Sequence, residues 1–149
     1  MKIAIGCDHG ALDLKNAAIK HLEAKGYEVK DFGTYTKDSC DYPEFAAAAA
    51  QAVANGECEK GIVLCTTGIG ISITANKVKG IRCACCSDCY SAKMTRKHND
   101  ANMIAMGARV VGVDLGRMIA ETFLTTDFEG GRHQRRVDQI MAIERGEEV

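Results

Sequence analysis

Short apolar runs alternate with longer amphipathic segments along the chain. After the first run, Ala11, Leu14, Ala18 and Leu22 recur at spacings of three and four, which predicts a helix with one buried face. Gly26 then predicts the end of that helix. The opposite, polar face of the helix is expected to carry Lys15, Asn16, Lys20 and Glu23. The apolar runs themselves predict strands at residues 2–6, 27–32, 61–65, 81–86 and 102–106.

This alternation predicts an α/β fold. Several strands are apolar on both faces, as in a parallel sheet that helices cover on each side. Further helices are expected at residues 44–54, 71–78, 90–97, 115–125 and 135–147. Right-handed crossovers between such units build a doubly wound, five-stranded parallel sheet, a Rossmann-like three-layer sandwich. No linker, repeat or low-complexity tract interrupts the 149 residues, so we expect one domain over residues 1–149.

Composition and charge narrow the possible functions. Hydrophobic residues make up 46% of the chain, enough for an ordinary globular core. The 19 Lys and Arg residues nearly cancel the 20 Asp and Glu residues, so no overall field would hold the protein on nucleic acid or on an anionic membrane. The longest early apolar run, Ile3–Ile5, is far too short for a signal peptide or a membrane span. We therefore expect a cytoplasmic protein.

The eight cysteines are expected to be reduced thiols, because a chain this rich in Ala, Ile and Val does not need disulfides to stay folded. Four of them crowd the segment Cys83–Cys89, which raises the alternative of a structural metal site. That segment follows Gly80–Arg82 and is interpreted as a buried strand, in which free Cys is a small hydrophobe. No second CxxC pair or His pair has zinc-ligand spacing, so no metal site is predicted.

Ligands of doubly wound sheets bind at the carboxyl ends of the strands. Two of the predicted strands are followed directly by residues that could bind a ligand. A ligand after the first strand would meet Asp8 and His9, although either side chain is also suited to capping the next helix. The segment Cys65–Ser72 passes from a strand through a glycine-bearing turn into a helix, where free N–H groups favour an anion. It lacks the ending of a Walker loop and the third glycine of a dinucleotide fingerprint. An inert, buried Cys65 is the alternative.

Polar residues also crowd two helix ends. Arg96–Asp100 closes a helix just before the last strand, where a solvated cap is the alternative to a functional role. Nearer the end of the chain, Arg132 and Arg136 are four residues apart and would share a helix face suited to phosphate. A solvated basic face is the alternative there.

Together these segments resemble the ribose-5-phosphate isomerase B family, which also includes the galactose-6-phosphate isomerase subunits. The resemblance covers essentially the whole chain. Its motifs are Gly6–His9, Asp41–Pro43, Cys65–Ile73, Ala75–Lys77, Tyr90–Ala92, His98–Asp100, Gly107–Gly112 and Gly130–Gln134. The family usually has Gly after its catalytic cysteine, whereas this chain has Thr66.

The resemblance implies an isomerase that uses neither a metal nor another cofactor. Cys65 matches the family's general base, which moves a proton between C2 and C1 of a sugar phosphate through a cis-enediolate. Loop amides are expected to stabilise the enediolate oxygen, with Thr67 orienting the loop. His98 matches the acid/base that opens the sugar ring. The other implied site residues are Thr66, Gly68, Ile69 and Gly70 in the loop, Asp8, Asn99 and Tyr42 at the sugar, and His9, Arg109, Arg132 and Arg136 at the phosphate.

The resemblance also implies a site shared between subunits of a homodimer or homotetramer, with the C-terminal helix at about residues 131–147 contributing to the contact. Ribose 5-phosphate and ribulose 5-phosphate are the expected substrate pair. One alternative is a six-carbon sugar phosphate, allose 6-phosphate or galactose 6-phosphate, because one extra carbon changes only the depth of the pocket. Another is a non-catalytic phosphate-binding module on the same fold. The presence of both Cys65 and His98 favours catalysis.

Overall fold

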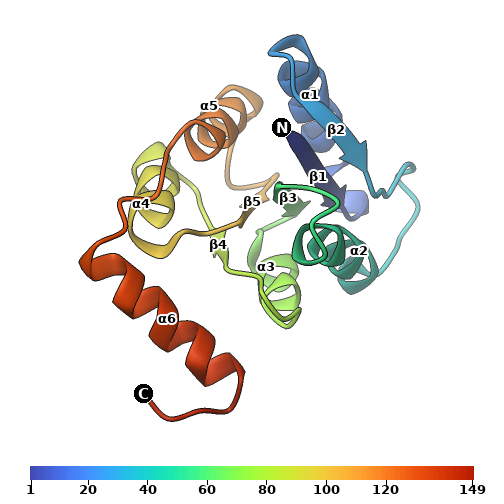
Figure 1. Ribbon diagram of the computed structural model, residues 1–149. Helices are drawn as coiled ribbons and strands as arrows, with labels where there is room; N and C mark the ends of the chain where they lie inside the picture. Colours follow the sequence, from blue (N-terminus) through green and yellow to red (C-terminus); the bar gives the residue numbers. More distant parts are fainter.

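The computed structural model describes residues 1–149 and contains one five-stranded sheet (Figure 1). The strands are β1 (Lys2–Cys7), β2 (Glu28–Asp31), β3 (Lys60–Cys65), β4 (Cys83–Cys85) and β5 (Met103–Gly107). They lie in the order β2-β1-β3-β5-β4, and every neighbouring pair is parallel. The predicted doubly wound, five-stranded parallel sheet is confirmed.

Helices cover both faces of this sheet. The helices of the chain are the short 3-10 helix η1 (His9–Ala11), then α1 (Leu12–Ala24), α2 (Tyr42–Ala54), α3 (Ile69–Ala75), α4 (Cys89–Asn99), α5 (Val113–Leu124) and α6 (Arg132–Glu144). Because α5 contacts both α1 and α4, these three helices share one face, while α2 and α3 contact each other on the other face (Figure 1). Right-handed crossovers produce this division, since the chain moves outward through α1 and returns through α2. None of the helices combines the length and the apolar character needed to cross a membrane.

The strands separate two apolar layers. The layer beneath α1, α4 and α5 holds large side chains that are fully buried, among them Ile3, Ile5, Leu64, Met106 and Phe123. The layer beneath α2 and α3 holds smaller ones, including Ala46, Ala49 and Ala50. Successive residues of β3 face opposite layers, which explains why this run is apolar throughout. Cys65 belongs to the α2 and α3 layer.

The prediction that Lys15 lies on the polar face of its helix is wrong. Its side chain is fully buried, and Nζ donates to Asp31 Oδ1 at 2.7 Å and to the Thr34 carbonyl at 2.6 Å. The same Nζ lies 4.8 Å from the centre of the Tyr35 ring. A buried ammonium needs such partners because desolvating an unpaired charge is costly. Lys15 therefore ties α1 to the segment that leaves β2.

The largest differences between predicted and observed helix ends are three residues, and they occur in two helices. The helix predicted at 71–78 ends at Ala75, because Asn76 donates to the Ser72 carbonyl at 3.0 Å and to the Cys83 carbonyl at 2.8 Å. The helix predicted from residue 135 already begins at Arg132, directly after two glycines with φ values of 67° and 57°. Such positive φ values are disfavoured for other residues, so the glycine pair allows the sharp turn into α6.

Different residues lie at the carboxyl ends and at the amino ends of the parallel strands. We call these two sides of the sheet its carboxyl edge and its amino edge. At the carboxyl edge, β3 and β5 end side by side, with Cys65 paired to Gly107. At the amino edge, α4 ends at Asn99 just before β5 begins. The last residue of α6, Glu144, accepts a hydrogen bond from the Gly80 amide at 3.0 Å, also at the amino edge. Figure 1 shows α6 extending away from the sheet.

Candidate active site

Cys65 lies where β3 turns into α3. Its side chain is buried, and its Sγ accepts a hydrogen bond from the Gly68 amide at 3.1 Å. Gly68 has a φ of 80°, and a Cβ at this position would lie 2.8 Å from the carbonyl carbon of Met106. Both the backbone conformation and the available space therefore require glycine. The resulting turn directs a backbone N–H at the sulfur.

The loop after Cys65 leaves other amides available. The Ile69 amide donates to Thr67 Oγ1 at 3.1 Å, so the Thr67 hydroxyl orients the start of α3, as expected from the resemblance. The amides of Thr66, Thr67 and Gly70 donate to no acceptor in the chain. Free amides beside a buried thiol are the donors that an oxyanion requires. Of the five loop amides expected to bind an anion, Gly68 and Ile69 are instead used within the loop.

Thr66 stands where the family usually has glycine, and Gly10 in the neighbouring turn leaves room for its side chain. A Cβ on Gly10 would lie 2.5 Å from Thr66 Cγ2. Such a contact is impossible without a shift, so the Thr66 methyl occupies the space that a side chain at position 10 would need. Thr66 thus packs the Cys65 loop against the turn that carries Asp8 and His9.

Asp8 and His9 occupy the carboxyl edge beside this loop. Asp8 is buried, and its Oδ1 accepts from the Gly10 amide at 2.9 Å, so it caps η1 as the sequence alternative proposed. A carboxylate has a second oxygen, which remains for a ligand hydroxyl. The Cys40 amide donates to His9 Nδ1 at 3.2 Å. When His9 is neutral, its proton is therefore on Nε2, which is free to donate to an anion.

Tyr42 and Arg109 complete the group at this edge. A Cβ on Gly70 would lie 2.6 Å from Tyr42 Cζ, so the Tyr42 ring packs directly on the start of α3. The Arg109 amide donates to the Thr66 carbonyl at 3.0 Å, which places this exposed arginine next to the Cys65 loop. We define the carboxyl-edge group as Asp8, His9, Tyr42, residues 65–70 and Arg109.

The remaining predicted site residues form a second group at the amino edge. His98 and Asn99 end α4, while Arg132 and Arg136 are exposed one turn apart on α6. The His98 ring stacks on the ring of His133, with centroids 4.3 Å apart. Burial lowers the pKa of His133, and the neighbouring charges of His98 and Arg132 act in the same direction. We define the amino-edge group as His98, Asn99, Arg132 and Arg136.

One chain does not bring the two groups together. Cys65 pairs with the last residue of β5, whereas Asn99 precedes the first residue of that strand. Four residue steps of about 3.3 Å separate the ends of β5, so the groups lie about 13 Å apart along the strand alone. His98 therefore cannot act on a sugar held against Cys65 of the same chain in this structure.

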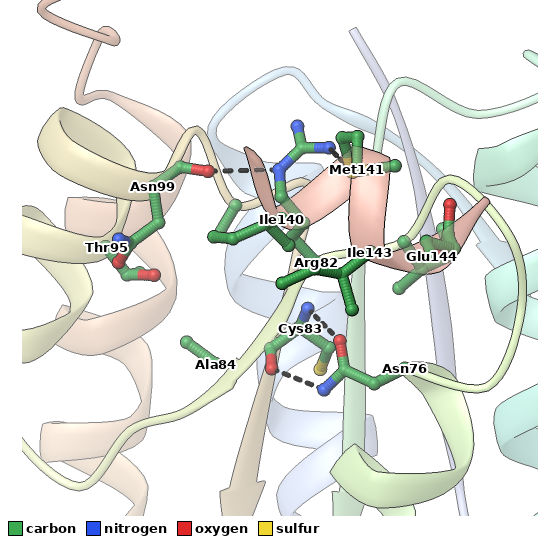
Figure 2. A pocket seen from close by; sticks show the side chains of 12 residues that line it. Asn76, Arg82, Cys83, Ala84, Thr95, Asn99, Ile140, Met141, Ile143 and Glu144 are labelled. Carbon is green, nitrogen blue, oxygen red and sulfur yellow. Dashed lines mark hydrogen bonds between the residues drawn. The ribbon is translucent and has the colours of Figure 1, made fainter. Parts of the chain in front are cut away.

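A cavity of about 470 Å³ adjoins the amino-edge group. Figure 2 shows its lining residues and the hydrogen bond of 3.0 Å from Arg82 Nε to the Asn99 carbonyl. Ile81, Ile140 and Ile143 supply much of its apolar wall. Two of these, Ile140 and Ile143, are 45% and 61% exposed. The cavity is thus a largely apolar hollow between α6 and the edge strand β4, bordered by Asn99.

The prediction that the cysteine-rich segment is a buried strand is wrong, because β4 is the last strand of the sheet and Cys85 on it is exposed. Of the four cysteines in Cys83–Cys89, only Cys86 is buried, while Cys83 and Cys89 are half-buried. All eight cysteines are free. Burial raises the pKa of Cys86 to about 12 and also raises the pKa of Cys83. These thiols stay protonated near neutral pH. The one group of three possible metal ligands in the structure lies elsewhere and comprises His98, Glu129 and His133. Sequence reasoning missed Glu129 and His133, although their spacing of four residues across the Gly130–Gly131 turn was a usable signal.

Comparison with known proteins places the chain in a family. The family model described as Ribose/Galactose Isomerase matches residues 3–140. Ribose-5-phosphate isomerase B of Escherichia coli K12 is 52% identical over 143 residues, which are 96% of each chain. D-erythrulose-4-phosphate isomerase of Pectobacterium atrosepticum is 45% identical over 141 residues, or 94% of this chain and 93% of that one.

Solved structures agree with the sequence comparison. Ribose-5-phosphate isomerase B of Clostridium thermocellum is 54% identical and superimposes with a TM-score of 0.97, covering 98% of this chain and 99% of that one. The resemblance seen in the sequence motifs is therefore confirmed by both sequence and fold. The chain belongs to the ribose/galactose isomerase family.

Proposed function

We propose that this protein interconverts ribose 5-phosphate and ribulose 5-phosphate, with Cys65 as the base that moves the proton. The observation that carries the proposal is the placement of the buried Cys65 thiol beside three unpartnered amides at the start of α3. Relatives named as ribose-5-phosphate isomerase B, identical at half of the aligned positions, support the choice of substrate. A cytoplasmic location would suit such a substrate.

The proposed reaction is a proton transfer between adjacent carbons. Cys65 removes the hydrogen from C2 of the open aldose, and the carbonyl electrons move onto O1 to give a cis-enediolate. The free amides of Thr66, Thr67 and Gly70 stabilise the charge on that oxygen. Transfer of a proton from O2 to O1 and return of the Cys65 proton to C1 then give the ketose. The carboxyl-edge group supplies the base and the oxyanion donors for these steps.

We propose that a second copy of the chain completes each site. Ring opening of the furanose requires an acid and a base, and His98 is the candidate, but it lies at the opposite edge of its own sheet. In a two-fold symmetric dimer, the amino-edge group of one subunit faces the carboxyl-edge group of its partner, and the reverse contact follows by symmetry. Each dimer would then contain two complete sites.

Exposed apolar residues support this assembly. Ile69 and Ile73 of α3 are 57% and 56% exposed next to Cys65. The apolar hollow beside Asn99 lacks an occupant from its own chain and is lined by isoleucines. Bringing Asn99 to the Cys65 loop of a partner would bring the partner's α3 to this hollow. Burial of these side chains would stabilise the dimer, and α6 would contribute to the contact as the family resemblance implies.

Phosphate binding would also use both subunits. His9 and Arg109 flank the Cys65 loop, while Arg132 and Arg136 extend from α6. Arginine donors pair with phosphate in a bidentate manner, and a His9 Nε2–H adds a further donor. With Asp8 and Asn99 at the sugar hydroxyls, the substrate would span the contact between the two subunits.

Subunit mixing tests the shared site. Cys65→Ser and His98→Asn chains, each alone, should be nearly inactive. After the two are unfolded together and refolded, random pairing makes half of the dimers mixed, and each mixed dimer has one intact site, so about one quarter of wild-type activity should return. Recovery of no activity, with both variants folded and dimeric, would mean that Cys65 and His98 act within one chain.

The relative named D-erythrulose-4-phosphate isomerase gives a specific reason to test other chain lengths. One carbon more or less changes the depth of a pocket and discriminates weakly. Values of kcat/KM should therefore be compared for ribose 5-phosphate, erythrulose 4-phosphate, allose 6-phosphate and galactose 6-phosphate. The proposal requires ribose 5-phosphate to give the highest value. A non-catalytic phosphate-binding module would turn over none of them.

A further inference from the structure

Three side chains that can ligate metal converge where α4 meets α6. The possible ligand atoms of His98, Glu129 and His133 lie within 4.8 Å of one another. The imidazole rings of His98 and His133 are stacked with an angle of 13° between their planes. His133 Nε2 lies 3.7 Å from Glu129 Oε2.

The backbone fixes this cluster from both sides. The Glu129 amide donates to the Lys97 carbonyl at 3.1 Å, which joins the turn before α6 to the last turn of α4. The His133 amide donates to the Gly130 carbonyl at 3.1 Å. These two bonds hold Glu129 and His133 next to His98 although they are more than thirty residues away in the sequence. His133 is only 6% exposed, so one ligand is held in the protein interior.

We propose that His98, Glu129 and His133 form an inhibitory binding site for Zn²⁺ or a similar divalent transition metal. Two histidines and one carboxylate form a common zinc ligand set, and they leave a fourth position for water. Imidazole and carboxylate ligands select such metals over Ca²⁺ and Mg²⁺, which prefer an all-oxygen environment. Within one chain the proposed site lies at the amino edge, away from Cys65. In the proposed dimer His98 faces the Cys65 loop of the partner, so a metal held here would border the shared site.

Binding requires a local rearrangement that the side chains allow. Zinc ligands lie about 2.0–2.2 Å from the ion, so the three atoms must approach one another by about an ångström or more. The nitrogen lone pair of an imidazole lies in the plane of its ring. Two stacked rings therefore cannot both direct a lone pair at one ion, and one ring must rotate toward it. His98 is half-buried and is the ring with room to turn. Glu129 must also exchange its contact with Lys97, 3.6 Å away, for the metal.

The surrounding charges set a limit on affinity. Arg132 and Arg136 add positive charge near His133 and oppose a cation, while Glu129 offsets part of that charge. The site is therefore suited to reversible control by the metal and not to permanent retention of it. Inhibition rests on the proposed function, because His98 bound to a metal has no lone pair with which to open the sugar ring.

A zinc titration of activity tests the inhibition. At a free Zn²⁺ concentration of about ten times the dissociation constant, activity should fall about tenfold and return when a chelator is added. Glu129→Gln and His133→Asn should each keep most of their activity at that concentration, because each loses one ligand. His21→Asn is a matched control, since His21 pairs with Glu121 at 3.2 Å without a third ligand. Equal zinc sensitivity in all four proteins would overturn the proposal.

A spectroscopic titration tests the site without reference to catalysis. Co²⁺ added to the Cys65→Ser protein should give visible absorption typical of nitrogen and oxygen ligands, with one ion per chain. Glu129→Gln in the same background should weaken this binding by about tenfold or more. The proposal fails if no Co²⁺ binds, or if a sulfur-to-cobalt charge-transfer band shows that thiols hold the ion. This result stands even if Cys65 and His98 prove to have no role in isomerisation.

Discussion

Removal of Asp31 should unfold the protein at a much lower temperature, because it strands a buried charge. The Lys15 side chain is fully buried and both Asp31 oxygens accept from its Nζ, at 2.7 and 2.9 Å. Breaking a buried ion pair by removing one partner costs about 3–5 kcal/mol. For a chain of this size, that cost corresponds to a fall in Tm of about 10 °C in the Asp31→Ala variant.

Thermal unfolding followed by circular dichroism, at one fixed protein concentration, measures this effect. Asp13→Ala is the control, because the ion pair of Asp13 with Lys37 is 3.3 Å long and both side chains are largely exposed. An exposed pair contributes less than about 1 kcal/mol, so its loss should hardly change the Tm. Adding Lys15→Met to Asp31→Ala removes the stranded charge and should restore part of the stability. Equal Tm values for Asp31→Ala and Asp13→Ala would refute the reasoning.

Three further predictions concern the site. Replacing Arg132 or Arg136 by Ala should mainly raise KM, with a smaller loss of kcat, because phosphate binding weakens in both the ground state and the transition state. Steady-state kinetics measure both constants, and an unchanged KM would show that the replaced arginine is not part of the site. Exhaustive chelation should leave turnover intact, because the proposed oxyanion donors are amides, and loss of activity that a divalent ion restores would contradict this. Gly10→Ala should lower the Tm and the activity, since its Cβ would lie 2.5 Å from the Thr66 methyl, and Thr66→Gly in the same chain should restore both.

The apolar pattern of the sequence was sufficient to predict the sheet. Fully apolar runs such as residues 61–65 indicated strands buried on both faces, and β3 has this environment. The exact ends were less predictable because side chains distant in sequence determine them. Asn76 ends α3 by bonding to Cys83, which the pattern of α3 alone does not reveal.

The burial of Lys15 was also hidden, because its position in the helix pattern resembles that of a solvated lysine. What buries it is Asp31 on another element and the carbonyl of Thr34. A charged residue can occupy an interior position only when partners from elsewhere in the fold satisfy it. Periodicity along one helix contains no information about such partners.

The candidate site residues were predicted from motifs that resemble the family, and the resemblance also implied a site shared between subunits. It did not indicate which of these residues lie together at each edge of the sheet. The sequence shows His98 and Cys65 in equally recognisable motifs, and neither motif indicates at which edge of the sheet its residue lies. Only the direction of α4, which returns from the carboxyl edge to the amino edge, shows that they are separated within one chain. The contact of Thr66 with Gly10 was similarly invisible, because it joins two turns that are distant in the sequence.

The most direct test of the proposed mechanism is the activity of the Cys65→Ser protein. Serine is nearly isosteric with cysteine, but its hydroxyl stays protonated near neutral pH and is a poor base. Steady-state assays with ribose 5-phosphate should show kcat lowered by about a hundredfold or more, while circular dichroism and affinity for the sugar phosphate stay close to those of the wild type. A Cys65→Ser protein with full activity would contradict the assignment of Cys65 as the base.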